Sequence, residues 1–320
     1  MSQQPAGEYL RHGQTPFFRL PQADLRSPEP YAGAGAVLLG VPYDGGTTHQ
    51  PGARLAPSAI RRVSALFQSY HPVHQVDVFR KLVTLDGGNV ALPPFDATLV
   101  RTVIQREVAQ VLEAGAAPFV VGGDQTVALP SLRAVAAKYG PLAVVHVDAH
   151  LDTSGPEVWG DAYHHGTPLR HALAEDLIER GQLWQVGLRA SWAHPEDGSF
   201  AAAYGARQVG MEALERRSVA ELVAAIRLGV GDRPLYVTFD IDAVDPAFAP
   251  GTGTPVPGGL TSREALQFLR GLKGLRLVGM DVVEVCPVLD SADITCHLAA
   301  GLLFEGLALR ALYCLRQPAA

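Results

Sequence analysis

The chain has 320 residues, of which 48% are hydrophobic, and it carries a formal net charge of −6 at pH 7. This length fits one large α/β domain or two small ones, with enough residues to bury a sizeable core. The acidic balance and the lack of any run of Lys and Arg argue against a nucleic-acid partner, because phosphate binding needs clustered cations.

The spacing of the cysteines and the composition of the N-terminal residues indicate the cellular compartment of the protein. Cys286, Cys296 and Cys314 have no CxxC spacing, which argues against a disulfide scaffold or a zinc knuckle and fits a reducing cytosol. Residues 1–10 contain no apolar core of a secretory signal, and no stretch reaches about 20 uninterrupted apolar residues, the length of a membrane span. We therefore expect a cytoplasmic protein that does not cross a membrane.

The chain is expected to consist of an N-terminal arm, residues 1–34, rich in Pro, Gln and Gly, and a single domain of residues 35–320. Short apolar runs predict buried strands at 36–41, 118–121, 142–147, 235–239 and 277–283, and helical spacing predicts helices at 100–114, 129–138, 219–228 and 262–272. Buried strands that alternate with helices indicate a three-layer α/β/α fold with a mostly parallel central sheet. Such sheets bind ligands at the carboxyl ends of their strands.

Polar clusters follow four of the predicted strands. They are residues 122–126 (GGDQT), 148–152 (DAHLD) and 240–246 (DIDAVDP), and Glu284 within residues 281–287 (DVVEVCP). In an extended chain alternate side chains point the same way, so the two carboxylates and the imidazole of DAHLD would converge. The first two carboxylates of DIDAVDP would converge in the same manner.

These convergent acidic groups predict a metal site. They repel one another unless a cation lies between them, and an oxygen-rich site with an imidazole suits Mn²⁺ better than structural zinc. A single Asp after a strand is more often a helix cap or an Asx turn, at odds of roughly three to one. Two such clusters on separate strands make the metal site the better interpretation.

Two other features have a plain structural interpretation. Gly251, Gly253, Gly258 and Gly259 mark either an ordinary loop or a rigid loop that fixes the pocket, which we favour. A phosphate cradle is disfavoured because no Lys follows in the manner of a P-loop. His146 lies deeper in its predicted strand than the DAHLD segment and is interpreted as packed rather than ligating.

Longer motifs resemble the signatures of the arginase, agmatinase and guanidino-acid hydrolase family. They are GVPYDGGTTHQPGARLAPSAIR, GGDQT, DAHLD, FDIDAVDPAFAPGTGTPVPGG and VVEVCP, with the loop YHHGTPLRH, and they extend over most of the chain. The segment DPAFAPGTGTPVPGG is the most specific. The resemblance implies an arginase-like fold, two Mn²⁺ ions per chain, and hydrolysis of a small guanidino compound to urea and an amine by a metal-bridging hydroxide.

The resemblance also implies metal-binding roles for individual residues. Asp148 and Asp240 match carboxylates that bridge both ions. His150 and Asp242 match ligands of one ion. Asp152 matches a ligand of the other ion that also hydrogen-bonds the hydroxide, from which it could pass a proton to the leaving amine.

Two more residues match groups that handle the substrate. Glu284 matches an acid that receives the guanidinium, which a carboxylate can hold by paired hydrogen bonds. His165 matches a proposed proton shuttle, a role that suits an ordinary pKa near neutrality. Without the resemblance, a surface-loop histidine is the better interpretation of His165, as it is of the neighbouring His164.

Gln125 departs from the family pattern because it occupies the place of a histidine ligand. An amide oxygen is a poorer donor than imidazole for a transition ion but acceptable to a hard cation, so occupancy of one site is expected to fall without vanishing. Three explanations stay open: a natural enzyme with a weakly held second metal, a non-catalytic homologue, or a deliberately replaced ligand.

Three classes of function are therefore compared. The leading one is an amidinohydrolase acting on a guanidino acid, such as guanidinobutyrate or a proclavaminate-like compound, or on agmatine; Arg170 and Arg189 are weak candidates to bind a carboxylate tail. The others are an impaired homologue that serves binding or assembly, and a zinc deacylase of the same fold, which the second carboxylate set and Glu284 disfavour. The resemblance also implies a homo-oligomer, a trimer or a hexamer.

Overall fold

The computed structural model describes residues 15–93 and 95–316. Residues 1–14 of the expected arm lie outside the described part. Phe17 and Phe18 are fully buried and belong to one of the two hydrophobic cores. The division into an arm of residues 1–34 and one domain of residues 35–320 stays a prediction.

The centre of the fold is an eight-stranded parallel sheet in the order β4-β1-β5-β10-β9-β6-β7-β8, and a small antiparallel hairpin lies apart from it. The strands are β1 (Ala36–Gly40), β2 (Tyr70–His71), β3 (Val76–Asp77), β4 (Thr84–Asn89), β5 (Ala117–Val121), β6 (Leu142–Val147), β7 (Ile178–Leu188), β8 (Arg207–Gly210), β9 (Pro234–Asp240) and β10 (Arg276–Val283). All five predicted strands are present in this sheet.

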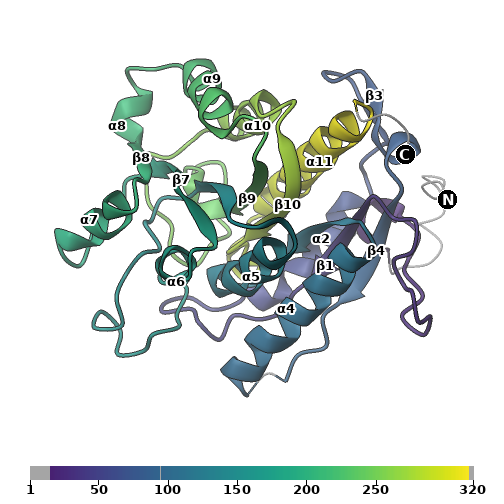
Figure 1. The fold of residues 1–320 in the computed structure, drawn as a ribbon, viewed down its shortest axis with the longest axis horizontal. Helices are drawn as coiled ribbons and strands as arrows, with labels where there is room; N and C mark the ends of the chain where they lie inside the picture. Colours follow the sequence, from purple (N-terminus) through teal and green to yellow (C-terminus); the bar gives the residue numbers. More distant parts are fainter. Residues whose placement is uncertain (1–14, 94, 317–320) are drawn as a thin grey trace.

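Helices cover both faces of the sheet (Figure 1). They are α2 (Ala56–Ser64), α3 (Val78–Lys81), α4 (Ala97–Glu113), α5 (Ala128–Tyr139), α6 (Pro168–Ala174), α7 (Glu196–Ala203), α8 (Met211–Leu214), α9 (Val219–Val230), α10 (Ser262–Gly271) and α11 (Ile294–Cys314). Leu38 and Phe119 pack into the core beneath α2, α10 and α11, whereas Val37 and Val120 pack into the core beneath α4, α5 and α6. This alternation confirms the three-layer α/β/α architecture.

Local sequence explains where several of these elements begin and end. Ser218 with Glu221 and Thr261 with Glu264 form capping boxes that start α9 and α10. Strand β5 ends at a pair of glycines, and Gly123 has a positive φ of 84°. A Cβ atom there would lie 2.9 Å from the Tyr43 carbonyl oxygen, so only glycine permits this tight exit from the strand.

Helix α11 needs a comment because of its composition. Among the described residues it is the one helix long and apolar enough to cross a membrane, but 78% of its most apolar window is buried inside the fold. It packs against α2, α10 and β10, as a core helix does.

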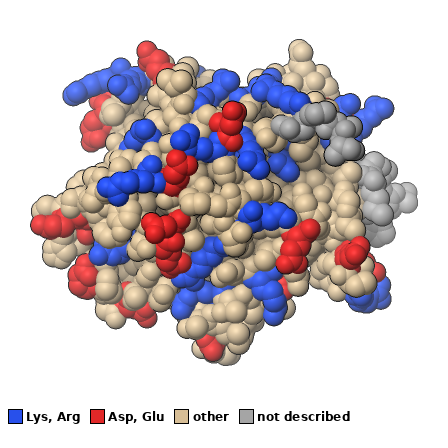
Figure 2. All heavy atoms as spheres, in the orientation of Figure 1, with Lys and Arg blue, Asp and Glu red and all other residues tan. Residues whose placement is uncertain are grey.

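On the face shown in Figure 2, Lys and Arg are interspersed with Asp and Glu rather than gathered into one patch.

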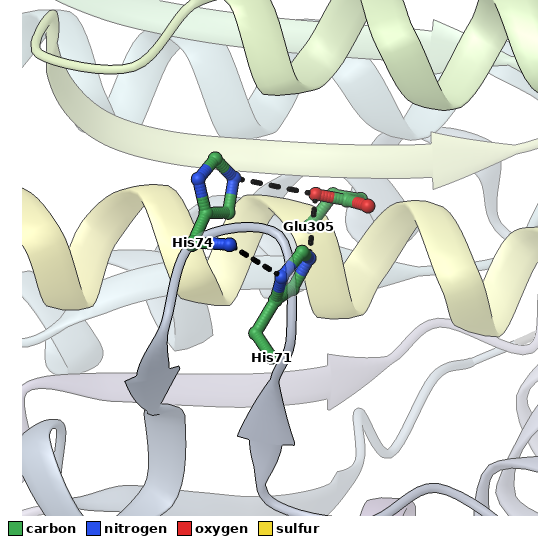
Figure 3. Close-up of side chains that lie close together, drawn as sticks. All are labelled: His71, His74 and Glu305. Atoms are coloured by element: carbon green, nitrogen blue, oxygen red, sulfur yellow. Dashed lines mark hydrogen bonds and ion pairs between the residues drawn. The ribbon is translucent and has the colours of Figure 1, made fainter.

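The hairpin of β2 and β3 is fastened to α11 by a buried polar cluster, shown in Figure 3. His71 Nε2 lies 2.9 Å from Glu305 Oε2, and Arg270 Nε lies 2.6 Å from Glu305 Oε1. Because the backbone N–H of His74 donates to His71 Nδ1, the ring proton of His71 is on Nε2 and points to Glu305. Burial alone would raise the pKa of Glu305, but His71, His74 and Arg270 lower it to about 2.

Replacing Glu305 by Gln should lower the free energy of unfolding by about 3 kcal/mol at neutral pH, because Arg270 loses a buried charged partner. The folded pKa of Glu305 lies below its unfolded value, so this contribution is present above about pH 4.3 and is lost as the pH falls toward about 2. Denaturant titrations at several pH values measure it. Glu179→Gln, in an exposed pair with Arg233, is the control and should cost less than about 1 kcal/mol. Equal losses in the two variants would contradict the buried role of Glu305.

Candidate metal centre

The four polar clusters meet at one edge of the sheet because β5, β10, β9 and β6 are adjacent strands. Gln125 follows β5, Glu284 follows β10, the DIDAVDP segment follows β9 and the DAHLD segment follows β6. All strands are parallel, so their carboxyl ends open on the same side. One pocket is lined by members of all four clusters, including Gln125, His150, Asp152, Asp240, Asp242 and Glu284.

Asp148, His150 and Asp242 are in mutual contact at the base of this pocket. His150 Nδ1 lies 2.9 Å from Asp242 Oδ2 and 3.3 Å from Asp148 Oδ1. Asp242 also accepts a hydrogen bond from the backbone N–H of Ala149, 3.1 Å away, which ties the two strand ends together. These three side chains offer ligand atoms that all lie within 4.8 Å of one another, close enough to share an ion.

The backbone does not bring these groups together in the way expected from an extended chain. Asp148 Oδ1 accepts the N–H of His150 at 2.6 Å, and Asp240 Oδ1 accepts the N–H of Asp242 at 2.8 Å. The chain turns after each aspartate, and residues 241–243 form a short 3₁₀ turn. Convergence therefore comes from two equivalent Asx turns, and the expectation of continued strand geometry was wrong.

The pKa shifts of the buried carboxyl groups indicate that their negative charges repel one another. Burial, and then the charge of Asp148, raise the pKa of Asp152 well above its ordinary value. Burial, and then the charge of Asp242, raise the pKa of Asp240 in the same way. Burial also works against the charge of Asp148, but His146 and His150 hold its pKa below the ordinary value. A divalent cation would remove this mutual repulsion.

Two buried oxygen atoms in the pocket have no hydrogen-bond partner within the described residues. They are Oε1 of Gln125 and Oδ2 of Asp152. Buried polar atoms are nearly always hydrogen-bonded, so two acceptors without a hydrogen-bond partner at one pocket fit a positively charged ligand. With four carboxylates and one imidazole, this donor set fits hard divalent ions such as Mn²⁺.

Glu284 and His165 stand together on another side of the pocket. Glu284 Oε1 accepts the backbone N–H of Gln125 at 2.8 Å and lies 3.0 Å from His165 Nδ1. His165 Nε2 lies 2.7 Å from Thr48 Oγ1. Burial lowers the pKa of His165, but the Glu284 carboxylate outweighs it and raises the pKa overall.

Two residues that line the pocket have an unusual backbone conformation. Asp152 has a φ of 53° and Glu284 has a φ of 60°, a conformation that non-glycine residues seldom adopt. Such strain costs about 1–3 kcal/mol per residue and persists where the surrounding structure enforces it, often at functional sites. Both residues with this backbone conformation, Asp152 and Glu284, line the pocket.

His146 has more contacts than the sequence analysis expected. It is buried as predicted, but its Nε2 lies 2.8 Å from Asp148 Oδ2 and 3.8 Å from Asp152 Oδ2. Its Nδ1 lies 3.2 Å from Gln185 Nε2. The two-residue period of a strand places residue 146 on the same side as residue 148, and this signal could have identified the contact. His164, interpreted as a surface-loop residue, is buried and lines the pocket.

The loop after β9 is held rigidly by Asp245. Its Oδ2 accepts the N–H groups of Gly258 at 2.6 Å and Gly259 at 3.1 Å, and its Oδ1 accepts that of Ala247 at 2.9 Å. A Cβ atom on Gly259 would lie 2.6 Å from the Asp245 nitrogen. The structure therefore agrees with the interpretation of this segment as a rigid loop beside the pocket.

Arg170 and Arg189 do not serve as the carboxylate-binding residues considered from the sequence. The Arg189 guanidinium donates to backbone carbonyls, including that of Asp242 at 2.7 Å. Arg170 donates to the Thr153 carbonyl at 3.2 Å and stacks over Phe200. Both cations are used to fix loops, and neither lines the pocket.

A buried, oxygen-rich acidic cluster beside a pocket with its own acid and imidazole is typical of a metal-dependent hydrolase. Residues 34–308 match the model of the arginase family, and the chain belongs to this family. The family is metal-dependent. The chain is therefore a hydrolase of the amidinohydrolase type, cleaving C–N bonds of guanidino compounds.

Relatives of known activity support the same assignment. The chain is 44% identical to proclavaminate amidinohydrolase of Streptomyces clavuligerus, over 90% of this chain and 91% of the relative. It is 40% identical to guanidinobutyrase of Pseudomonas aeruginosa, over 91% of this chain and 90% of the relative. The solved structure of the Streptomyces clavuligerus amidinohydrolase superposes with a TM-score of 0.88 at 42% identity, covering 95% of this chain and 99% of that one.

Replacing Asp240 by Asn should reduce bound metal and urea formation by about 100-fold or more, since even residues behind metal ligands change affinity by 10- to 100-fold. Metal per chain and urea release, measured after equilibration with the same Mn²⁺ supply, test this. Asp232→Asn, an exposed change, is the control. Native metal content and turnover in Asp240→Asn would remove Asp240 from the metal centre.

Proposed function

We propose that this protein hydrolyses a small guanidino compound to urea and an amine at a site that holds two Mn²⁺ ions. The proposal assigns Asp148, His150, Asp152, Asp240 and Asp242 as ligands, with Gln125 as a sixth. The observation that carries it is the convergence of Asp152, Asp240 and Asp242 on one pocket, with Asp148 grouped beside His150 and Asp242. One oxygen of Asp152 and the amide oxygen of Gln125 have no hydrogen-bond partner there among the described residues. When bound, the ions would supply an acidified water as the nucleophile.

Glu284 is proposed to hold the substrate guanidinium. A guanidinium carbon is a poor electrophile because its charge is shared over three nitrogens, so it needs accurate positioning. Glu284 Oε1 is already engaged by Gln125 and His165, which fix the carboxylate group in one orientation. The planar guanidinium can then donate to this oriented carboxylate.

Proton movement is proposed for Asp152 and His165. The unpartnered Oδ2 of Asp152 lies in the pocket and can take a proton from the attacking water and pass it to the leaving amine. His165 lies between Glu284 and Thr48 at the edge of the pocket, and its side chain keeps 13% of its surface exposed, so it can exchange protons with solvent.

The substrate tail is proposed to be an amine or a neutral group rather than a carboxylate. The outer pocket is lined by Val158, Trp159, Trp192 and Asp197, and no Lys or Arg is among the described residues that line it. Aromatic faces and a carboxylate favour a cationic tail. Relatives include both agmatinases and guanidino-acid hydrolases, so the pocket lining leads us to rank agmatine above a guanidino acid.

A urea-release screen with added Mn²⁺ over agmatine, guanidinobutyrate, guanidinopropionate and arginine tests the proposal. We expect the highest kcat/KM for agmatine. A higher value for either guanidino acid would overturn the tail assignment while leaving the reaction intact. Absence of urea from every compound, with metal bound, would favour the binding or assembly alternative.

Replacing Glu284 by Gln should raise KM and lower kcat, because the guanidinium is held in both ground and transition states. Loss of one charged hydrogen-bond acceptor at a reacting group is expected to cost about 100-fold in kcat/KM. Steady-state kinetics on the preferred substrate measure this, with the exposed Glu215→Gln as the control. Kinetics like those of the control would exclude Glu284 from substrate binding.

We also propose that the protein is a cytoplasmic homo-oligomer, a trimer or a hexamer. The free cysteines Cys286 and Cys296 are buried, which fits a reducing compartment. Phe95 and Leu228 are exposed large apolar side chains and are candidates for subunit contacts. Light scattering coupled to size exclusion gives the oligomeric mass, and a monomer would contradict the proposal.

A further inference from the structure

Gln125 is buried, and the two ends of its amide group lie in different environments. The nitrogen Nε2 donates to Thr238 Oγ1 at 3.1 Å. The oxygen Oε1 has no hydrogen-bond partner, and Gln125 lines the pocket together with Asp152 and Asp240. The Gln125 side chain is therefore held by a hydrogen bond at its nitrogen end and offers an acceptor without a hydrogen-bond partner at its oxygen end.

A chain of buried hydrogen bonds decides which end of the amide faces the pocket. Thr238 Oγ1 donates its single proton to Asp281 Oδ1 at 2.6 Å, and Tyr236 Oη donates to Asp281 Oδ2 at 2.9 Å. A carboxylate only accepts, so Thr238 must direct its proton to Asp281 and its lone pairs to Gln125. The amide can satisfy those lone pairs only with its N–H₂ end.

The opposite orientation of the amide would be unfavourable on both sides. The amide oxygen would then face the lone pairs of Thr238, and two N–H donors would face the acidic cluster where cations are expected. With the observed orientation, Oε1 adds a neutral oxygen donor to the carboxylates of Asp152 and Asp240. Amide oxygens are ordinary ligands of hard divalent ions, whereas imidazole suits nickel, zinc and copper better.

We propose that Gln125 is a positioned metal ligand, oriented by Thr238 through Asp281 and Tyr236, which shifts the metal centre toward hard ions such as Mn²⁺. This inference rests on the metal centre of the proposed function, and it treats Gln125 as a working part of that centre. Thr238 is a positioning residue, because it acts on the ion only through Gln125.

Metal binding without turnover tests the positioning. In Thr238→Val the amide is free to reorient, and the affinity of one of the two Mn²⁺ ions should fall about tenfold or more. Thr238→Ser keeps the hydroxyl and should restore native binding. Free Mn²⁺ is followed by electron paramagnetic resonance during titration of the metal-free protein. Thr84→Val, which removes another buried hydroxyl in β4, controls for loss of fold.

A double-mutant cycle separates positioning from a general structural effect. In the Gln125→Ala background, Thr238→Val should change Mn²⁺ affinity by less than about twofold, since the oriented amide is already gone. Equal losses in the native and Gln125→Ala backgrounds, or native Mn²⁺ affinity in Thr238→Val alone, would overturn the proposal.

Gln125→His tests the ion preference. The ratio of Mn²⁺ affinity to Ni²⁺ affinity should fall about tenfold or more in this variant, because imidazole favours the later ion. An unchanged ratio would overturn the selectivity part of the proposal. The measurements need no substrate, so a protein that binds Mn²⁺ through Gln125 but releases no urea would refute the proposed function and leave this inference standing.

Discussion

The mutual repulsion of buried carboxylates is the constraint on which the rest of this site depends. Asp148, Asp152, Asp240 and Asp242 are all buried at the ends of two adjacent strands. Removing several negative charges from water costs far more than packing can return, unless cations balance them. The contacts of His146 and His150 with Asp148 are therefore best explained as the supports of a metal centre.

The frame is made largely by backbone geometry. The same Asx turn recurs after β6 and after β9, and it directs the second residue of each pair into the pocket. Positive φ values at Asp152 and Glu284 turn two further acids inward. Because turns and strain of this kind are fixed by the fold, the proposed ligands are held in place in advance, which would reduce the entropy lost on binding an ion.

Sequence patterns predicted the sheet and the membership of the site better than its internal geometry. Apolar runs revealed five of the eight strands of the sheet. Strands β4, β7 and β8 were not identified, and β4, with the sequence TLDGGN, has no such run. The acids of the DAHLD and DIDAVDP segments were expected in one place because parallel strands share an edge. Their exact approach depends on turns that a strand period does not encode. The contact of His146 with Asp148, in contrast, follows from that period and was overlooked.

Gln125 shows where prediction from sequence ends. From the sequence alone, Gln125 is a weaker metal ligand than the histidine of the family pattern. The sequence does not distinguish an inactivating substitution at this position from a functional one. The orientation of the amide depends on Thr238, 113 residues away in sequence, whose hydroxyl proton is directed to Asp281 and whose lone pairs select one end of the amide. A histidine ligand would also need an acceptor for its second ring N–H, so the same lone pairs of Thr238 would suit either residue. What the hydrogen-bond direction adds is the orientation of the glutamine, because it leaves the amide oxygen rather than the amide nitrogen without a hydrogen-bond partner among the described residues and available to a cation.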